Sequence, residues 1–430
     1  MSMESDSKIG NLLCNSAEIA ELILCGMNSR QLSSCAKVCS LWSSIAKRLK
    51  RQRRMFLHTF QVLEDKSCGL RDSKTGSDVS EDTANLFLNR LRDSWSEPGN
   101  ALVFATSRAN RYINDTTGTF GTYLPYSPAV MDRIGSCLPK SCLLLLGGAR
   151  GVVGSPWEGP ERDAYKYGDP VELEYAQAFS CLLLPAHPPD GVCIRPFLVT
   201  EDHIQKGKRG EDWYSSMAFK SLVGLPVDEE ARDTKCILMF TIDELDNIKS
   251  DLSDMVNGFV DSCGACSFTL GGAVLNRLLA KGRSPIKGRV ICTGFCFSGD
   301  AVRSASVLLV QGTCGAEAVE RELSRLKRDS GFEGWKRGST VAFMFASVKR
   351  GSRLHHRPNV EADAFARVFP GVPLVGLFDS WQIGNEYVPH LSGKQPGKGK
   401  RKAPVSYLHE RATIIVLLSL GSSEFVVRCP

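Results

Sequence analysis

The stretch LSSCAKVCSLWSSIAKRLKRQRR, residues 32–54, changes from an apolar helical pattern to an almost wholly basic run. Trp42, Ile45 and Leu49 recur at the spacing of one helix face, and Ser40 is a suitable N-cap for that helix. The basic residues then fall in the last turns, where positive charge suits the helix dipole. The stretch therefore predicts a short amphipathic helix with a positively charged end.

Residues upstream of this helix predict two more. Asn15 and Glu18 have the spacing of a capping box ahead of an apolar face, and Gly26 is a predicted left-handed C-terminal cap. Ser29 is the predicted N-cap of the next helix. Three helices of this size make a poor independent core, so we expect the unit to gain stability by pressing an apolar face against a partner.

The net charge of +6 is unevenly distributed over the 430 residues. Residues 47–54 contain six basic side chains, residues 393–402 contain five, and neither run contains an acid. Subtracting these eleven charges leaves −5 on the rest of the chain. A mildly acidic body with two basic runs is not typical of a general nucleic-acid binder, and we expect no specific nucleic-acid partner. The first run remains open to two interpretations, a solvated helix end or a nuclear-import signal.

The 16 cysteines are scattered, many of them within apolar runs such as SCLLLL and VICTGFCF. They are typical of buried thiols in a reducing compartment. The polar N-terminus MSMESDSKIG predicts no signal peptide, and no segment approaches the roughly 20 apolar residues of a membrane span. We therefore expect a soluble protein of the cytoplasm and nucleus, without a membrane partner.

The N-terminal helical pattern resembles the F-box, the docking module of substrate receptors in cullin-RING ubiquitin ligases. The string VCSLW, residues 38–42, carries the most recognisable part of that resemblance. The resemblance implies an F-box over residues 10–58 and contacts with a Skp1-like adaptor through seven side chains: Ile19, Ile23, Leu24, Leu32, Val38, Cys39 and Trp42. The alternative is an unrelated helical hairpin or a fragment of a larger helical core.

The remainder of the chain alternates between apolar runs and helical patterns. Nine runs of β type are ALVFAT, CLLLL, FSCLLL, CILMFT, VICTGFCF, SASVLL, TVAFMFA, LVGLF and TIIVLL. Runs that are apolar throughout suit strands covered on both faces, and residues 316–328 and 359–369 predict helices, the second capped by Asn359. A polar stretch makes residues 59–97 a predicted linker, and GSPWEGPERDAYKYGDP a predicted surface loop. The sequence therefore predicts a mixed α+β protein, with small N-terminal helices followed by a layered α/β body with mixed sheets.

Several stretches of this body resemble the FIST sensory domain. They are TGFCFSGDAVRSASVLL, TVAFMFASVKRG, NVEADAFARVFPGVPLVGLF and TIIVLLSLGSS, with a looser match through LLLLGGARGVVGSP and LLLPAHPPDGVCIRPF. The resemblance implies a FIST N-terminal-like domain over residues 98–284 and a FIST C-terminal domain over residues 285–425. FIST domains accompany signalling modules in bacteria and are thought to sense small ligands. In a receptor that also carries an F-box, the domain is expected to select client proteins.

Two late segments are candidates for client binding. The turn DSWQIG, residues 379–384, offers Trp381 as an amphipathic anchor, although a buried core tryptophan fits the sequence equally well. The loop SVKRGSRLHHR supplies Arg350, Arg353 and Arg357, which could bind an acidic motif. We expect these segments to lie close together because they belong to consecutive late elements.

Motifs for catalysis, phosphate binding and metal binding are absent or incomplete. The chain contains no GxSxG, HExxH, Walker lysine loop or GxGxxG, and GGARGVVG is better explained as a turn. Cys263 and Cys266 form one CxxC pair, and the nearby Cys292 and Cys296 fit an apolar strand better than a zinc site. We expect no catalytic residue, metal or cofactor.

These features together favour a non-catalytic substrate receptor of an SCF-type E3 ubiquitin ligase. Its partners would be the Skp1-like adaptor, through it a cullin-RING complex, and protein clients destined for degradation. The competing hypothesis is a FIST protein whose output is the sensing of a small ligand. An enzyme with an unrecognised site is the weakest alternative.

Overall fold

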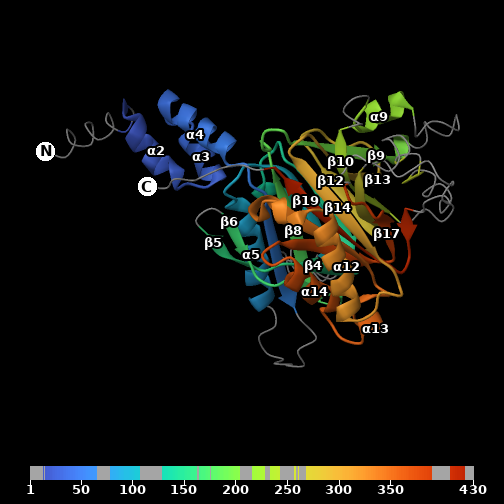
Figure 1. Cartoon of the computed structure of the whole chain (residues 1–430). Coiled ribbons are helices and arrows are strands. Elements are labelled where there is room, and N and C mark those ends of the chain that lie inside the picture. Colours follow the sequence, from blue (N-terminus) through green and yellow to red (C-terminus); the bar gives the residue numbers. More distant parts are fainter. Residues whose placement is uncertain are drawn as a thin grey trace.

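The structure, a computed structural model, describes residues 13, 15–64, 78–106, 128–161, 164–174, 176–203, 216–227, 233–242, 256, 257, 260, 268–389 and 407–421. A small helical unit stands at one side of a large β-rich body (Figure 1). The helices of this unit are α2 (Ala17–Cys25), α3 (Ser29–Cys35) and α4 (Ser40–Gln52). They enclose a small core of their own: Ala20, Leu24, Leu32, Ile45, Ala46 and Leu49.

The caps of α2 differ from the sequence prediction. Ser16, not Asn15, is the N-cap, and its Oγ accepts a hydrogen bond from the Ile19 amide at 3.5 Å. The left-handed cap predicted at Gly26 is wrong, because this residue has φ −82 and ψ −3. Its right-handed turn allows the Met27 amide to bond the Leu24 carbonyl at 3.1 Å, and the chain passes directly into the next helix.

The caps of the other two helices lie one residue before the predicted ones. Asn28 caps α3 through a reciprocal capping box with Gln31, in which both hydrogen bonds measure 2.8 Å. Ser29 is consequently the first helical residue. Cys39 precedes α4 and its side chain makes no cap hydrogen bond, so Ser40 likewise lies inside the helix.

The body contains three larger mixed sheets and a hairpin. The first sheet has the order β1-β8-β2-β3-β12. Its strands are β1 (Leu57–Glu64), β2 (Pro98–Thr106), β3 (Leu143–Ala149), β8 (Gln177–Pro185) and β12 (Arg277–Lys281). The second sheet has the order β18-β17-β11-β10-β13-β9. Its strands are β9 (Cys193–Thr200), β10 (Thr234–Ile242), β11 (Thr269–Leu275), β13 (Val290–Ser298), β17 (Trp381–Gly384) and β18 (Leu408–His409).

The third sheet has the order β14-β19-β15-β16-β4-β7. Its strands are β4 (Gly151–Gly154), β7 (Val171–Leu173), β14 (Val302–Leu309), β15 (Thr340–Ser347), β16 (Leu374–Asp379) and β19 (Thr413–Leu420). The hairpin pairs β5 (Trp157–Glu161) with β6 (Ala164–Tyr167). Each larger sheet contains one parallel pair, β2 with β3, β10 with β11 and β15 with β16, among antiparallel neighbours. All nine apolar runs singled out in the sequence form strands, which confirms the mixed α+β prediction.

Helices cover the outer faces of two sheets. On the first sheet, α5 (Asp78–Arg92) and α7 (Pro128–Cys137) share an apolar cluster with β2, β3 and β8. On the third sheet, α12 (Ala316–Asp329) and α14 (Val360–Val368) do the same with β14, β15, β16 and β19. The other helical segments are α9 (Met217–Val223), α13 (Gly351–His355) and the short 3₁₀ turns η1 (Phe332–Gly334) and η2 (Arg337–Ser339). The body is therefore layered, with strands inside and helices outside (Figure 1).

Three phenylalanines join the three sheets at the centre of the body. Phe104 of β2 lies 5.2 Å from Phe240 of β10 and 6.5 Å from Phe345 of β15, measured between ring centroids. The rings of Phe240 and Phe345 are 5.7 Å apart, and all three pairs meet edge to face. This arrangement suits the aromatic quadrupoles. Each ring comes from a different sheet, so the body has one shared core.

Two features of the predicted domain plan differ from the structure. Residues 59–97, predicted as a linker, contain β1 and α5, whose apolar side chains are buried in the body. The predicted boundary at residue 284 does not divide the sheets. β4 and β10 lie before it, and they pair with β16 and β13, which lie after it. The predicted loop at residues 154–170 likewise holds the β5–β6 hairpin.

Arg53, at the end of the basic run, fixes the helical unit to the body. Its side chain is only 7% exposed and donates to the carbonyls of Met27 and of Cys25, the latter at 2.8 Å. The guanidinium lies 3.5 Å from the ring centroid of Trp95, in the segment between α5 and β2. One buried cation thus connects the α2–α3 turn to the body.

Polar contacts around Arg53 reinforce this joint. The Ser29 amide donates to the Ser94 carbonyl at 3.1 Å, and Lys50 Nζ lies 3.1 Å from Glu97 Oε1. Arg54 pairs with Asp190 at 2.6 Å in the β8–β9 turn. The helical unit is therefore held at several points along its contact with the body.

His58 of β1 is a second buried polar contact between elements. Its Nδ1 donates to the Cys181 carbonyl of β8 at 2.9 Å, and its Nε2 accepts from the Ser155 amide at 3.1 Å. These partners select the neutral ring with the proton on Nδ1. Burial lowers the pKa of His58 from 6.5 to about 4, against smaller opposing effects of the two backbone hydrogen bonds.

We predict that His58 makes the folded state acid-sensitive between pH 6.5 and pH 4. In this interval the unfolded chain binds a proton that the folded chain does not, so stability falls as the pH is lowered. The expected loss is about 3 kcal/mol, because each pKa unit corresponds to about 1.4 kcal/mol. Urea unfolding at several pH values should show that the free energy of unfolding depends less steeply on pH in His58→Gln than in wild type. The same slope in His58→Gln and in the exposed-site control His187→Gln would contradict the assignment.

We predict that Arg53→Ala loosens the helical unit while the body stays folded. The variant removes the donor from two partly buried carbonyls, and the loss of such a hydrogen bond costs about 1 kcal/mol. Hydrogen exchange should therefore accelerate in α2, α3 and α4 and remain unchanged in β2, β10 and β15. Arg51→Ala, a change at an exposed position of the same helix, is the matched control. Unchanged exchange in the Arg53→Ala helices would show that the joint does not depend on this side chain.

Candidate functional site

The helical unit exposes three large apolar side chains. Leu22 is 56% exposed, Ile23 is 38% exposed, both on α2, and Val38 in the turn before α4 is 59% exposed. These residues, called here the exposed apolar set, contrast with Leu24 and Leu32, which are fully buried inside the unit. The neighbours on α2 therefore have opposite roles, with Leu24 in the unit's core and Leu22 and Ile23 in solvent.

The seven predicted adaptor residues are thus divided by the fold. Ile23 and Val38 are exposed, Leu24 and Leu32 are buried, and the remaining three are half-buried: Ile19, Cys39 and Trp42. The indole nitrogen of Trp42 donates to the Leu13 carbonyl at 2.8 Å, which holds the chain preceding α2 against α4. Leu22 was not among the predicted residues, although it directly precedes Ile23 and lies on the same exposed side of α2.

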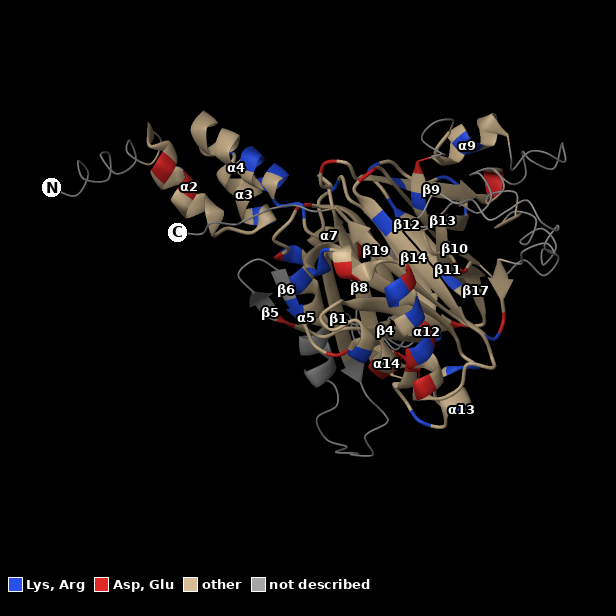
Figure 2. Ribbon diagram, in the orientation of Figure 1, with Lys and Arg blue, Asp and Glu red and all other residues tan. Residues whose placement is uncertain are grey.

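The basic run is split between solvent and protein partners. Figure 2 shows Lys and Arg positions in blue on α4 and acidic positions in red on α2. Lys47 and Arg51 are exposed, and Arg48 pairs with Glu21 of α2 at 2.6 Å. Lys50, Arg53 and Arg54 are used in the joint described above. The end of α4 is therefore mainly a structural contact, and the second basic run, residues 393–402, lies outside the described residues.

Arg350 is a core residue, which corrects its predicted role in a client-binding rim. It is 1% exposed, and its Nη2 lies 2.6 Å from Glu361 Oε1 of α14. Its guanidinium also donates to the carbonyls of Val310 at 2.6 Å and Thr313 at 2.9 Å. A guanidinium that is enclosed in this way cannot contact a client directly. Its function is to fix the loop after β14 to the loop after β15.

Glu361 is the centre of this buried charge cluster. His355 Nε2 lies 3.0 Å from the same carboxylate oxygen that Arg350 contacts. Burial alone would raise the pKa of Glu361, but Arg350 and the hydrogen bond from His355 outweigh it, so the pKa is lowered. Glu172 of β7 behaves in the opposite way, because burial and the nearby charge of Glu361 raise its pKa. The cluster therefore holds one ionised carboxylate paired with arginine.

The remaining predicted client residues stay at the surface. Arg353 of α13 and Arg357 beyond it are exposed. Trp381 is half-buried at the start of β17 and packs beside the apolar cluster of the second sheet. The expected proximity of the two segments is confirmed, since the Val348 amide donates to the Asp379 carbonyl at 3.1 Å. Sequence reasoning therefore predicted the proximity of the two segments but not the burial of Arg350.

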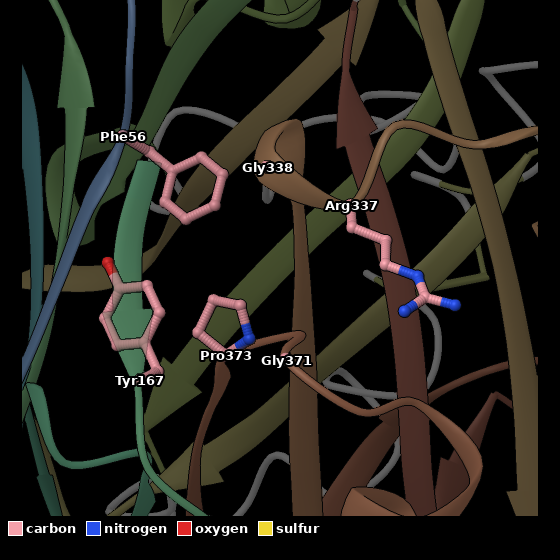
Figure 3. A pocket seen from close by; sticks show the side chains of 6 residues that line it. All are labelled: Phe56, Tyr167, Arg337, Gly338, Gly371 and Pro373. Carbon is pink, nitrogen blue, oxygen red and sulfur yellow. The ribbon is translucent and has the colours of Figure 1, made fainter. Parts of the chain in front are cut away.

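A tight cavity and a wider hollow lie among the described residues of the body. The cavity, shown in Figure 3, has a volume of about 20 Å³ between the rings of Phe56, Tyr167 and Pro373. It has room for about one water molecule. The hollow measures about 310 Å³ and includes Cys193, Arg195, Asp233 and Ser298 in its lining. Only the hollow reaches the lower end of the volume range of small-molecule sites, about 300 Å³.

The two thiols of β13 are core residues. Cys292 and Cys296 of β13 are fully buried, and burial raises the pKa of Cys292. Cys263 and Cys266 lie outside the described residues. Within the described ranges, no group of three or more His, Cys, Asp and Glu side chains could hold a metal ion. Over the same ranges, no helix is both long and apolar enough to cross a membrane.

Comparisons with family models and with solved structures do not identify the fold of this chain. No family model matches the chain. Two cyanuric acid hydrolase structures align with TM-scores of 0.38 (from A. caulinodans) and 0.35. Their identities are 10% and 9%, and they cover 86% and 85% of this chain and 99% and 100% of their own. These TM-scores support no inference about fold or activity.

The sequence relatives are more informative. The chain is 26% identical over 427 residues to F-box only protein 22 of Homo sapiens, which covers 96% of this chain and 95% of the human protein. The same identity and coverage hold for F-box only protein 22 of Pongo abelii. Because the similarity includes both the helical unit and the body, this chain is F-box only protein 22-like over nearly its whole length.

Proposed function

We propose that this chain is the substrate-recognition subunit of an SCF-type E3 ubiquitin ligase. The observation that carries the proposal is the exposed apolar set on a helical unit that is similar to part of F-box only protein 22. The exposed apolar set binds the Skp1-like adaptor, which links the chain to a cullin-RING complex. The body binds client proteins for ubiquitination and proteasomal degradation.

The physical basis of adaptor binding is the removal of apolar surface from water. Leu22, Ile23 and Val38 are large and aliphatic, yet the fold leaves them between 38% and 59% exposed. Complete burial of a fully exposed side chain of this kind contributes about 1.5–3 kcal/mol, and covering these partly exposed ones contributes roughly half of that. A unit with so small a core of its own gains further stability when a partner covers this surface.

In this proposal the chain contributes proximity rather than covalent chemistry. A client lysine held near a ubiquitin thioester meets it at a raised effective concentration. No catalytic side chain of this protein is required for that effect. A fixed joint between the docking helices and the body makes the effect stronger, since a floating body would dilute the client over a larger volume.

The adaptor test uses exposed positions so that folding is spared. Ile23→Asp combined with Val38→Asp should reduce capture of purified Skp1 by at least about tenfold, because a loss of about 1.4 kcal/mol already gives that factor. The measurement is Skp1 binding by the full-length protein, with circular dichroism as a check of folding. Leu222→Asp, on an equally apolar exposed position of α9, should bind Skp1 like the wild type. Undiminished capture by the double variant would refute the docking role.

A second candidate function is the sensing of a small ligand by the body. The observation that favours it is the hollow of about 310 Å³, which places a guanidinium, a carboxylate and a hydroxyl around one space. A ligand that binds only the folded state raises the melting temperature, and the rise grows with the logarithm of the ligand concentration once that exceeds Kd. This candidate and the receptor role make different predictions for the isolated protein.

We predict no large thermal shift from small polar metabolites. Melting temperatures should be measured with free amino acids and short carboxylic acids at millimolar concentration, for wild type and for Asp233→Ala. A stabilisation of several degrees that Asp233→Ala abolishes would favour sensing over the receptor role. Equal melting temperatures with and without these compounds are the expected result.

We also propose that the protein works in both cytoplasm and nucleus. The proposal rests on the basic runs and on the free thiols, which suit a reducing compartment. A nuclear-import test should replace Lys47 and Arg51, which are exposed, and spare Arg53, whose loss would disturb the joint.

A further inference from the structure

At one end of the strands of the third sheet, loops from distant parts of the chain come together. The register pairs Leu309 with Thr413, Ala346 with Thr413, and Ser347 with Asp379. It follows that β14, β15 and β16 all end where β19 begins. β4 begins at the same end, since Phe378 pairs with Gly151. These strand ends and their loops, together with the helix α13 that follows β15, are called the third-sheet edge.

The backbone of the third-sheet edge is fixed by buried polar contacts. Arg350 binds the carbonyls of Val310 and Thr313 and pairs with Glu361, as described above. Ser347 Oγ donates to the Glu410 carbonyl at 2.6 Å. Gly351, at φ +45, could not carry a side chain, because an added Cβ would lie 2.5 Å from Glu174 Oε1. Its neighbour Ser352 donates its amide to that oxygen at 2.6 Å. The loops are therefore preorganised.

The exposed charge on this preorganised edge is positive. Lys349 is paired with Glu410, and Arg150 lies 3.7 Å from Asp379. Arg353, Arg357 and Arg411 are exposed and make no ion pair with any carboxylate in the described part of the chain. Arg411 contacts only the neutral Gln311, at 3.5 Å. These guanidiniums, called here the arginine set, are available to an external anion.

Trp381 follows the third-sheet edge along the chain and belongs to β17 of the second sheet. Trp381 follows Asp379 at the end of β16 by two residues and is half-buried, so part of its indole faces solvent. Indoles of this kind are enriched at protein interfaces, where they contribute large contact area at low entropic cost. Arginine likewise pairs with planar carboxylates through two parallel hydrogen bonds. Trp381 therefore adds a partly exposed apolar surface two residues beyond the end of β16, and the arginine set supplies the groups that bind carboxylates.

We propose that the third-sheet edge binds an acidic segment of a client polypeptide. Carboxylates of the client pair with the arginine set, and an apolar client side chain packs on Trp381. This inference rests on the proposed receptor function and adds the chemical class of the client. A nucleic acid fits less well, because affinity for a phosphate backbone requires an extended positive surface and the rest of the chain is acidic apart from its two basic runs.

The test uses the full-length protein and fluorescein-labelled peptides. The probe is a short peptide of alternating glutamate and leucine, and its matched control replaces every glutamate with glutamine. We expect saturable binding of the acidic probe that weakens as salt is raised, and no binding of the neutral control. Arg353→Glu, Arg357→Glu and Arg411→Glu combined should weaken binding of the acidic probe by at least tenfold. Trp381→Ala should weaken it by a smaller factor.

Matched surface variants separate the edge from general electrostatics. Lys140→Glu, Arg283→Glu and Lys287→Glu combined change the net charge equally at exposed sites away from the edge, and should leave probe binding unchanged. Equal weakening in both triple variants would overturn the proposal. Binding of a phosphoserine-bearing peptide or of an oligonucleotide, without binding of the glutamate probe, would also overturn it.

Skp1 capture by the same edge variant tells the two hypotheses apart. Retained Skp1 capture with lost probe binding supports both the receptor function and the acidic-client inference. Retained Skp1 capture with probe binding unchanged overturns the inference and leaves the receptor function standing. If Ile23→Asp with Val38→Asp does not impair Skp1 capture, the receptor function fails whatever the peptides do.

Discussion

The edge-to-face contact among Phe104, Phe240 and Phe345 is the constraint on which the body depends. Each ring belongs to a different sheet, so none of the sheets can bury its inner face without the others. The surrounding cluster likewise draws apolar side chains from strands on both sides of residue 284. The body is consequently one cooperative core, although the sequence resemblance divides it into two named halves. Substitutions in either half are expected to act on the same unfolding transition.

The strands were predictable because continuous apolar runs indicate coverage on both faces. The pairing partners of the strands could not be predicted. β4, for example, pairs with β16 across more than two hundred residues, and such pairing depends on side chains that meet only in the folded chain. β1 was missed for a related reason. Its sequence LHTFQVLE mixes polar and apolar residues, and it stands between a basic run and a polar stretch. Its buried polar residue His58 finds partners in Cys181 and Ser155, which local pattern cannot reveal.

The candidate site shows the same limit at the level of single residues. The sequence analysis placed Ile23 and Val38 in one set with Leu24 and Leu32, which are buried, and it read Arg53 and Arg350 as surface charge. A buried arginine can be told from an exposed one only by the groups that accept its hydrogen bonds. The acceptors of Arg53 are backbone carbonyls, which every residue carries, and Arg350 pairs with Glu361, eleven positions away. Burial of a guanidinium needs such complete pairing, and the folded chain supplies it in both cases.

The joint at Arg53 connects the helical unit to the core by a short path. Arg53 lies against Trp95, and the segment that carries Trp95 leads directly into β2, the strand that holds Phe104. The exposed apolar set and the shared aromatic core are therefore separated by packed elements rather than by a flexible linker. A receptor that acts through proximity benefits from this stiffness, because effective concentration falls as the tether lengthens. The stiffness comes from strand β1 and helix α5, which lie in the segment where a linker was expected.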